Sequence, residues 1–211
     1  MKKYIAEGFG TFVLSLVVIT FAAGKQAGLT PVFAAVTLAL FVNTIGGISG
    51  AHLNPAVTIG VWSLKKISRD DALGYIAAQL VGGMLAIAAA SLLISDLASK
   101  LAGMQVRVTD NPMIAAAEAI GALVFAFGVS AVIHGAVEKP VQGMVVGGSL
   151  LVGLFLAGTV SNGVLNPAVA MALGSFNLMY LIGPIVGAVV GMKMYTYLSG
   201  VSSGRLRKNP R

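Results

Sequence analysis

Two copies of the tripeptide Asn-Pro-Ala are the residues of this sequence whose types and spacing indicate a functional site. They stand at Asn54, Pro55, Ala56 and at Asn166, Pro167, Ala168. Asparagine is a favoured helix N-cap, because its side-chain oxygen accepts a backbone N–H of the first turn. Proline is favoured at the next position, where the helix does not need its missing N–H. Each copy therefore predicts a helix start, over residues 54–64 and 166–174.

The two predicted helices are too short to cross a membrane. At about 1.5 Å per residue, each covers about half of a hydrocarbon layer about 30 Å thick. If they enter from opposite faces, their starts meet near the midplane, where two positive helix ends repel cations and protons. Asn54 and Asn166 can then turn their amide N–H groups toward an uncharged solute that carries acceptors. The preceding stretches, residues 50–52 and 162–164, are expected to be extended and to present backbone carbonyls.

The composition is typical of a membrane protein. Of the 211 residues, 57% are apolar and 10% are charged, and the mean hydropathy is +0.91, which leaves too little polar surface for a soluble domain. The net charge of +7 comes from basic residues between the apolar runs, so it indicates membrane orientation and no nucleic-acid partner. Because the chain has no cysteine, a disulfide framework and a thiolate metal site are excluded.

Six apolar runs are long enough to cross a bilayer. They cover residues 4–23, 31–48, 72–94, 112–133, 141–160 and 178–198. An even number of spans puts both chain ends on one side, and the basic residues mark that side as cytoplasmic. We therefore expect a multi-pass protein of the cell membrane with both termini in the cytoplasm. The basic residues of that side are Lys2, Lys3, Lys65, Lys66, Arg69, Lys139, Arg205, Arg207, Lys208 and Arg211, against Lys25, Lys100 and Arg107 on the other.

The chain contains an internal repeat. Five consecutive identities, beginning at Leu53 and at Leu165, align the two Asn-Pro-Ala segments at an offset of 112. Glu7 in the first span aligns with Glu118 in the fourth at an offset of 111. Because three spans per copy is an odd number, the second copy must enter the membrane upside down relative to the first.

These observations predict an all-α membrane protein with six transmembrane helices, two re-entrant half-helices and an inverted 3+3 repeat. We expect one channel domain over residues 1–211. Its first repeat covers about 1–97 and its second about 112–200, and residues 201–211 form a basic cytoplasmic tail.

Glu7 and Glu118 are carboxylates inside apolar spans. Such residues are by default candidates for function, and a proton relay is one interpretation. We favour a structural interpretation, because each lies near the membrane face from which the re-entrant segment of its own copy enters. Each can accept hydrogen bonds from backbone N–H groups that the broken helix leaves unpaired.

The sequence resembles the major intrinsic protein family, the aquaporins and glycerol facilitators. The resemblance lies in the paired Asn-Pro-Ala motifs, AEGFGTF at 6–12, ISGAHLNPAVTIGVW at 48–62 and VIHGA at 132–136, and it covers essentially the whole chain. It implies a homotetramer in the lipid bilayer with one pore per subunit, passive conduction of water and small neutral solutes, and no enzymatic activity, cofactor or metal. It also implies that His52 lines the cytoplasmic vestibule, although a purely structural histidine is an equal alternative.

The sequence departs from this family at the outer constriction. Most members have Arg directly after the second Asn-Pro-Ala, whereas this chain has Val169. The spacing of the family implies that Ala34, Leu154 and Gly163 are the other constriction positions. Because all four residues are uncharged and none is aromatic, we expect an outer filter wide and apolar enough to pass glycerol as well as water.

Three other classes of function must be compared with a channel. A secondary transporter with inverted repeats would need a titratable or ion-coordinating cluster at the midplane, and an intramembrane enzyme would need a nucleophile with a base. Asn54 and Asn166 provide neither. A non-conducting, junction-forming relative of the channels is not distinguished by the sequence, and a flux measurement would separate it.

Overall fold

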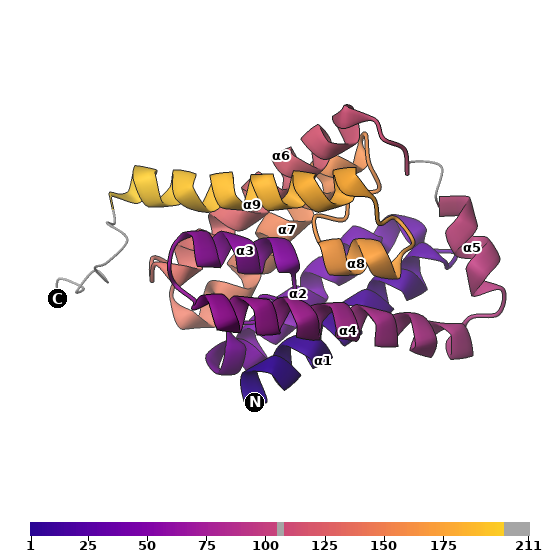
Figure 1. Ribbon diagram of the computed structural model, residues 1–211, viewed down its shortest axis with the longest axis horizontal. Helices are drawn as coiled ribbons and strands as arrows, with labels where there is room; N and C mark the ends of the chain where they lie inside the picture. Colours follow the sequence, from indigo (N-terminus) through magenta and orange to yellow (C-terminus); the bar gives the residue numbers. More distant parts are fainter. Residues whose placement is uncertain (105–107, 201–211) are drawn as a thin grey trace.

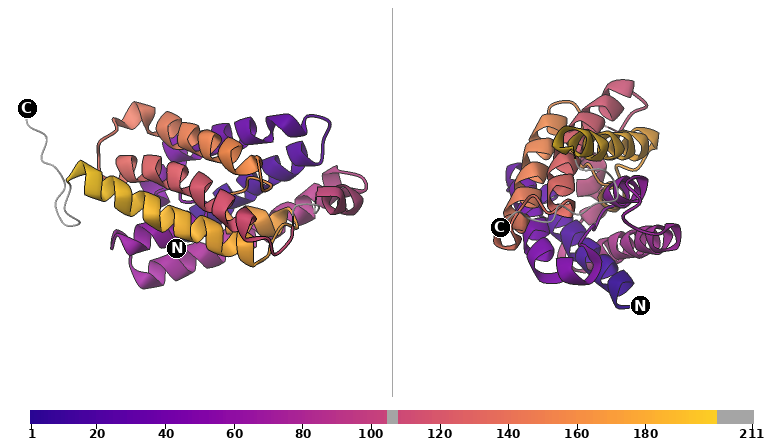
Figure 2. Two further views of the ribbon diagram at one scale, coloured as in Figure 1. Left: turned by 90° about the horizontal axis from the view of Figure 1, so that it is seen from above. Right: turned by 90° about the vertical axis from the view of Figure 1, so that its left-hand side faces the viewer.

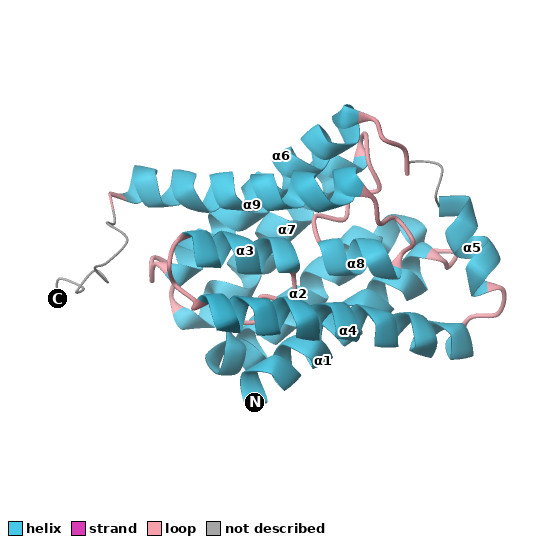
Figure 3. Cartoon of the chain, viewed as in Figure 1, coloured by secondary structure: helices cyan, strands magenta, loops and turns pink. Residues whose placement is uncertain are grey.

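The computed structural model describes residues 1–104 and 108–200, and within these ranges it contains helices and loops but no strand (Figures 1 and 3). The tail predicted at 201–211 lies outside the described residues. Six segments are long and apolar enough to cross a membrane, which confirms the predicted fold class. They are α1 (Lys2–Ala22), η1 with α2 (Ala27–Leu29 and Thr30–Ser49), α4 (Arg69–Leu93), α6 (Pro112–Ile133), η3 with α7 (Lys139–Val141 and Gln142–Gly158) and α9 (Leu178–Ser199).

Two short helices begin within the Asn-Pro-Ala motifs, as the sequence predicts. They are α3 (Pro55–Ser63) and α8 (Pro167–Ala172). Helix α8 is shorter than the predicted 166–174, because the chain turns at Gly174, which has a φ of 72° in the left-handed region that favours glycine.

The half-helices lie between two of the long helices. Figure 1 shows α3 and α8 between α4 and α9, with other long helices behind them, and Figure 2 shows the same bundle from above and end-on. Helix α3 packs against α9 and α4, and α8 packs against α4 and α1. The long helices approach closely at small residues, since a β-carbon at Gly82 would clash with the backbone of Gly8, and one at Gly187 with that of Ala119.

A helix that the sequence analysis did not predict, α5 (Leu97–Met104), lies between the two repeats. It occupies the end of the molecule opposite the C-terminal end of α9 (Figure 1). Leu97 is buried and Leu101 packs against the core. The connection between the repeats therefore covers one end of the bundle with a short amphipathic helix.

Candidate conduction pathway

Each Asn-Pro-Ala motif begins its half-helix with an asparagine cap. Asn54 and Asn166 have extended backbones, with φ of −159° and −148°. The Oδ1 atom of Asn54 accepts the N–H of Ala56 at 2.8 Å, and that of Asn166 accepts the N–H of Ala168 at 3.1 Å. Because both oxygens are used in this way, both side-chain amide groups face away from their own helices.

The two asparagine amides also join the halves of the chain. Nδ2 of Asn54 donates to the carbonyl oxygen of Leu165 at 2.8 Å, and Nδ2 of Asn166 donates to that of Leu53 at 2.9 Å. The expectation that all amide N–H groups face the solute was therefore wrong in part. One N–H of each asparagine holds the opposite loop, which leaves each Nδ2 with one further N–H to donate.

The sequence predicts extended backbone in the loops before the asparagines, at 50–52 and 162–164. The structure differs, because several loop residues are left-handed. Ala51 and Leu53 have φ of 48°, and Gly163 and Leu165 have φ of 61° and 56°. Left-handed conformations at non-glycine residues are strained and persist only where their surroundings hold them. Here they turn successive N–H groups toward one side, where a carboxylate accepts them.

Glu7 is that carboxylate in the first half. It is fully buried, and Oε1 accepts the N–H of His52 at 3.0 Å while Oε2 accepts that of Leu53 at 2.7 Å. Its oxygens also accept the hydroxyl of Ser49 at 2.6 Å and Nε2 of Gln79 at 2.8 Å. Glu7 thus fixes the loop before Asn54, whose N–H groups are outside a helix and need another acceptor.

Glu118 has the corresponding position in the second half. It is also fully buried, and it accepts the N–H groups of Val164 at 3.0 Å and Leu165 at 2.6 Å. The hydroxyl of Ser161 donates to its Oε1 at 2.6 Å. Both carboxylates therefore lie behind the loops, where they accept backbone N–H groups and neighbouring side-chain donors, and neither lines the cavities described below.

His52 is held by a polar chain that begins at Glu7. Nε2 of Gln79, which donates to Glu7, also donates to the hydroxyl of Thr58 at 3.0 Å, and Nδ1 of His52 lies 3.1 Å from that hydroxyl. The imidazole packs edge-on against Tyr75, with ring centroids 5.2 Å apart. Gln79 and Thr58 are not predicted from the sequence, because no motif marks them and their role depends on packing between helices.

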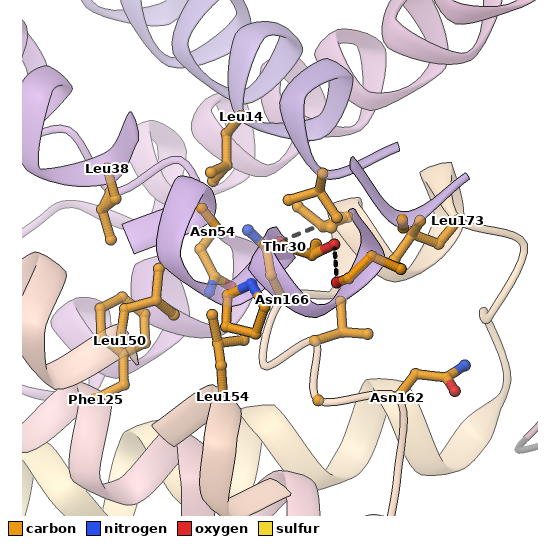
Figure 4. Close-up of a pocket in the computed structure, with 18 of the residues that line it drawn as sticks. Leu14, Thr30, Leu38, Asn54, Phe125, Leu150, Leu154, Asn162, Asn166 and Leu173 are labelled. Atoms are coloured by element: carbon orange, nitrogen blue, oxygen red, sulfur yellow. Dashed lines mark hydrogen bonds between the residues drawn. The ribbon is translucent and has the colours of Figure 1, made fainter. Parts of the chain in front are cut away.

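The predicted pore residues from both halves line one cavity, with a volume of about 260 Å³, which we name the asparagine chamber. Figure 4 shows Asn54 and Asn166 near its middle, with Leu38, Leu150 and Phe125 toward one end and Asn162 and Leu173 toward the other. Pro55, Ala56, Pro167 and Ala168 are buried and do not line it. The predicted positions that line the chamber are Ala34, His52, Asn54, Leu154, Gly163, Asn166 and Val169.

A second cavity, with a volume of about 430 Å³, lies on the side of Ser49 and Lys66, and we name it the lysine chamber. Its lining includes Ser68, Asp71 and Tyr75. His52, Leu38 and Phe125 line both chambers. Among the residues that the structure describes, no group of three His, Asp or Glu side chains could hold a metal ion.

Comparison with known proteins places this geometry in a family. A sequence model described as major intrinsic protein matches residues 1–195. The chain is 32% identical over 210 residues to the glycerol uptake facilitator protein-like 6 of Lactiplantibacillus plantarum, covering 90% of this chain and 94% of the relative. It is 30% identical over 222 residues to aquaporin NIP3-1 of Arabidopsis thaliana, covering 94% of this chain and 68% of the relative. The fold is similar to the X-ray structure of the aquaglyceroporin from Plasmodium falciparum, with a TM-score of 0.65 and 20% sequence identity. The match covers 95% of this chain and 96% of that chain.

Proposed function

The chain belongs to the major intrinsic protein family, and we propose that it is a passive membrane channel for water and for small uncharged solutes such as glycerol. The observation that carries this proposal is the asparagine chamber, in which Asn54 and Asn166 meet from opposite halves of the chain. Its wall offers N–H donors between apolar side chains, which suits a solute with acceptor oxygens and no charge.

The proposed exclusion of cations rests on the two half-helix starts. The N-terminal ends of α3 and α8 lie at Asn54 and Asn166, and helix N-termini carry partial positive charge. A cation in the chamber would meet these two ends, and no carboxylate is among the described residues that line it. Glu7 and Glu118 are proposed to act as scaffold, since their oxygens are occupied by loop donors.

The proposed outer filter consists of Ala34, Leu154, Gly163 and Val169. All four line the asparagine chamber, and none carries a charge or an aromatic ring. Val169 stands where most of the family has Arg, so the filter lacks a guanidinium that would narrow it. We infer that this filter is wide and apolar, and that it admits glycerol beside water.

The membrane arrangement follows from the spans and charges. The protein is a multi-pass membrane protein. We propose that it lies in the cell membrane as a homotetramer, that each chain is one channel domain with both termini in the cytoplasm, and that the lysine chamber opens to the cytoplasm.

Stopped-flow light scattering on proteoliposomes tests the proposed function. Water, glycerol, urea and larger polyols are compared at equal protein content. We expect fast, non-saturating water flux with a low activation energy, and measurable glycerol flux. Liposome shrinkage no faster than in protein-free vesicles would contradict conduction and would favour a non-conducting relative. Water flux without glycerol flux would contradict the proposed conduction of glycerol.

A further inference from the structure

We propose that the size limit of the pathway is set by Leu38, His52 and Phe125, which we name the inner ring, and not by the outer filter. This inference rests on the proposed function, since a size limit has meaning only in a conducting channel. It places the selective passage on the side of the asparagine pair from which the first re-entrant segment enters.

The first argument is the way the two chambers meet. The asparagine chamber is lined by the outer filter, by Asn54 and Asn166 and by the inner ring. The lysine chamber begins at the same ring and extends toward Lys66. A solute that crosses the molecule must leave one chamber and enter the other, and the inner ring is the lining that they share.

The second argument is the size of the side chains at the two candidate constrictions. The outer filter includes Ala34 and Gly163, which leave space, and it lies within the wall of one chamber. The inner ring has a leucine, a phenylalanine and a histidine, and it belongs to the lining of both chambers. The lining that the two chambers share therefore consists of bulky residues.

The inner ring is also held in place. Leu38 of α2 and Phe125 of α6 are each only 2% exposed, so both side chains are closely packed. His52 is fixed by Thr58 on one side and by Tyr75 on the other. A ring that is held by packing and by hydrogen bonds discriminates by size better than one that can move aside.

The ring offers one hydrogen-bonding group. The hydroxyl of Thr58 donates to the carbonyl oxygen of Asn54 at 3.0 Å, so we assign Nδ1 of His52 as the donor to Thr58. Nε2 of His52 is then an acceptor at the ring. A hydroxylated solute can donate to this acceptor while its carbons contact Leu38 and Phe125, whereas a bulkier polyol must displace one of these side chains.

The test widens each constriction separately. Phe125→Leu enlarges the inner ring, Leu154→Ala enlarges the outer filter, and Phe127→Leu is the matched control on the same helix, since Phe127 packs against Tyr195 and lines neither chamber. Permeability to glycerol and to four- and five-carbon polyols is divided by water permeability on the same proteoliposomes. Monodispersity and water flux establish that each variant is folded.

We expect Phe125→Leu to raise the ratio for the larger polyols by about tenfold, which is within the range by which one methylene changes discrimination in a fitted site. The rise for Leu154→Ala should be much smaller. A larger rise for Leu154→Ala than for Phe125→Leu, or an equal rise for Phe127→Leu, would overturn the inference while leaving conduction intact. If Phe125→Leu does not fold, Leu38→Ala must produce the same rise. Wild-type vesicles that do not conduct water would refute the proposed function and this inference together.

Discussion

The two halves of the chain use the same backbone scaffold, but they place different side chains at the pathway. In each half a buried glutamate accepts two consecutive loop N–H groups and a serine hydroxyl, and an asparagine caps the half-helix that follows. The first half then adds a polar chain from Gln79 through Thr58 to His52. At the offset of 112, the second half has Val164 for His52 and Ala170 for Thr58.

This difference separates two requirements. Unpaired backbone groups at membrane depth must be satisfied in both halves, because an open loop in lipid costs several kcal/mol per group, on the order of 2–7. His52 and the polar chain that holds it occur only in the first half. We infer that the scaffold is constrained in both repeats, whereas the wall of the pathway is free to differ between them.

The largest effect should come from the shared scaffold. Glu7→Gln and Glu118→Gln each replace an acceptor by an amide whose N–H₂ group faces loop N–H donors. We expect each to lower stability by about 1–3 kcal/mol and to reduce the yield of assembled protein. Thermal unfolding in detergent and size-exclusion profiles measure this effect, with Glu138→Gln, an exposed carboxylate, as control.

A variant at Glu7 or Glu118 with a wild-type melting temperature and an altered solute ranking would show that the carboxylate acts on solutes. The comparison would also fail if one half tolerated the change and the other did not, because the scaffold would then not be shared.

The next effect concerns the positive ends of the half-helices. Asn54→Asp and Asn166→Asp each place a carboxylate at a helix start, which offsets its partial positive charge, so we expect cations to enter. Potassium and proton leak across proteoliposomes measures it. Since α3 has 9 residues and α8 has 6, the two variants show whether both ends contribute. Vesicles that stay ion-tight with both variants would contradict the electrostatic exclusion.

The sequence predicts the six spans, the two half-helices and the buried glutamates, because each depends on local pattern or on the repeat. It does not predict that Nδ2 of Asn54 donates a hydrogen bond to the carbonyl oxygen of Leu165, because that contact joins residues 111 apart, between the two halves of the chain. It also misses the left-handed residues at Ala51 and Leu53, since neither alanine nor leucine signals positive φ. Phe125 carries no motif either, and only the packing of α6 against the pathway brings it to the chambers.

A smaller effect is expected from arginine at two equivalent positions. Val169 lines the asparagine chamber, and Val57, its equivalent at the offset of 112, lines the lysine chamber. Val169→Arg should narrow the outer filter, so that the glycerol-to-water ratio falls, because water can pass beside the guanidinium and a three-carbon polyol must displace it. Both fluxes are measured on the same vesicles.

Val57→Arg is the matched control, because it places the same side chain on the other side of the asparagine pair. We expect its effect on the glycerol-to-water ratio to be weaker, since the lysine chamber is the larger of the two. An unchanged ratio in Val169→Arg would mean that residue 169 does not face a constriction, and the assignment of the outer filter would be wrong.

The smallest effect should come from Thr58→Ala, which gives the first half the residue that the second half has at position 170. The change leaves the hydrogen bonds of Glu7 to the loop in place, but it removes the partner of Nδ1 of His52 and one partner of Gln79. We expect a loss of stability of about 1 kcal/mol. Because His52 then loses its fixed orientation, we also expect a modest rise in the glycerol-to-water ratio.

Ser63→Ala removes a hydroxyl from the same half-helix, and Ser63 lines neither chamber, so it is the matched control. A rise in Thr58→Ala alone would link the polar chain of the first half to solute selection, whereas equal ratios in both variants would mean that this chain only supports the fold.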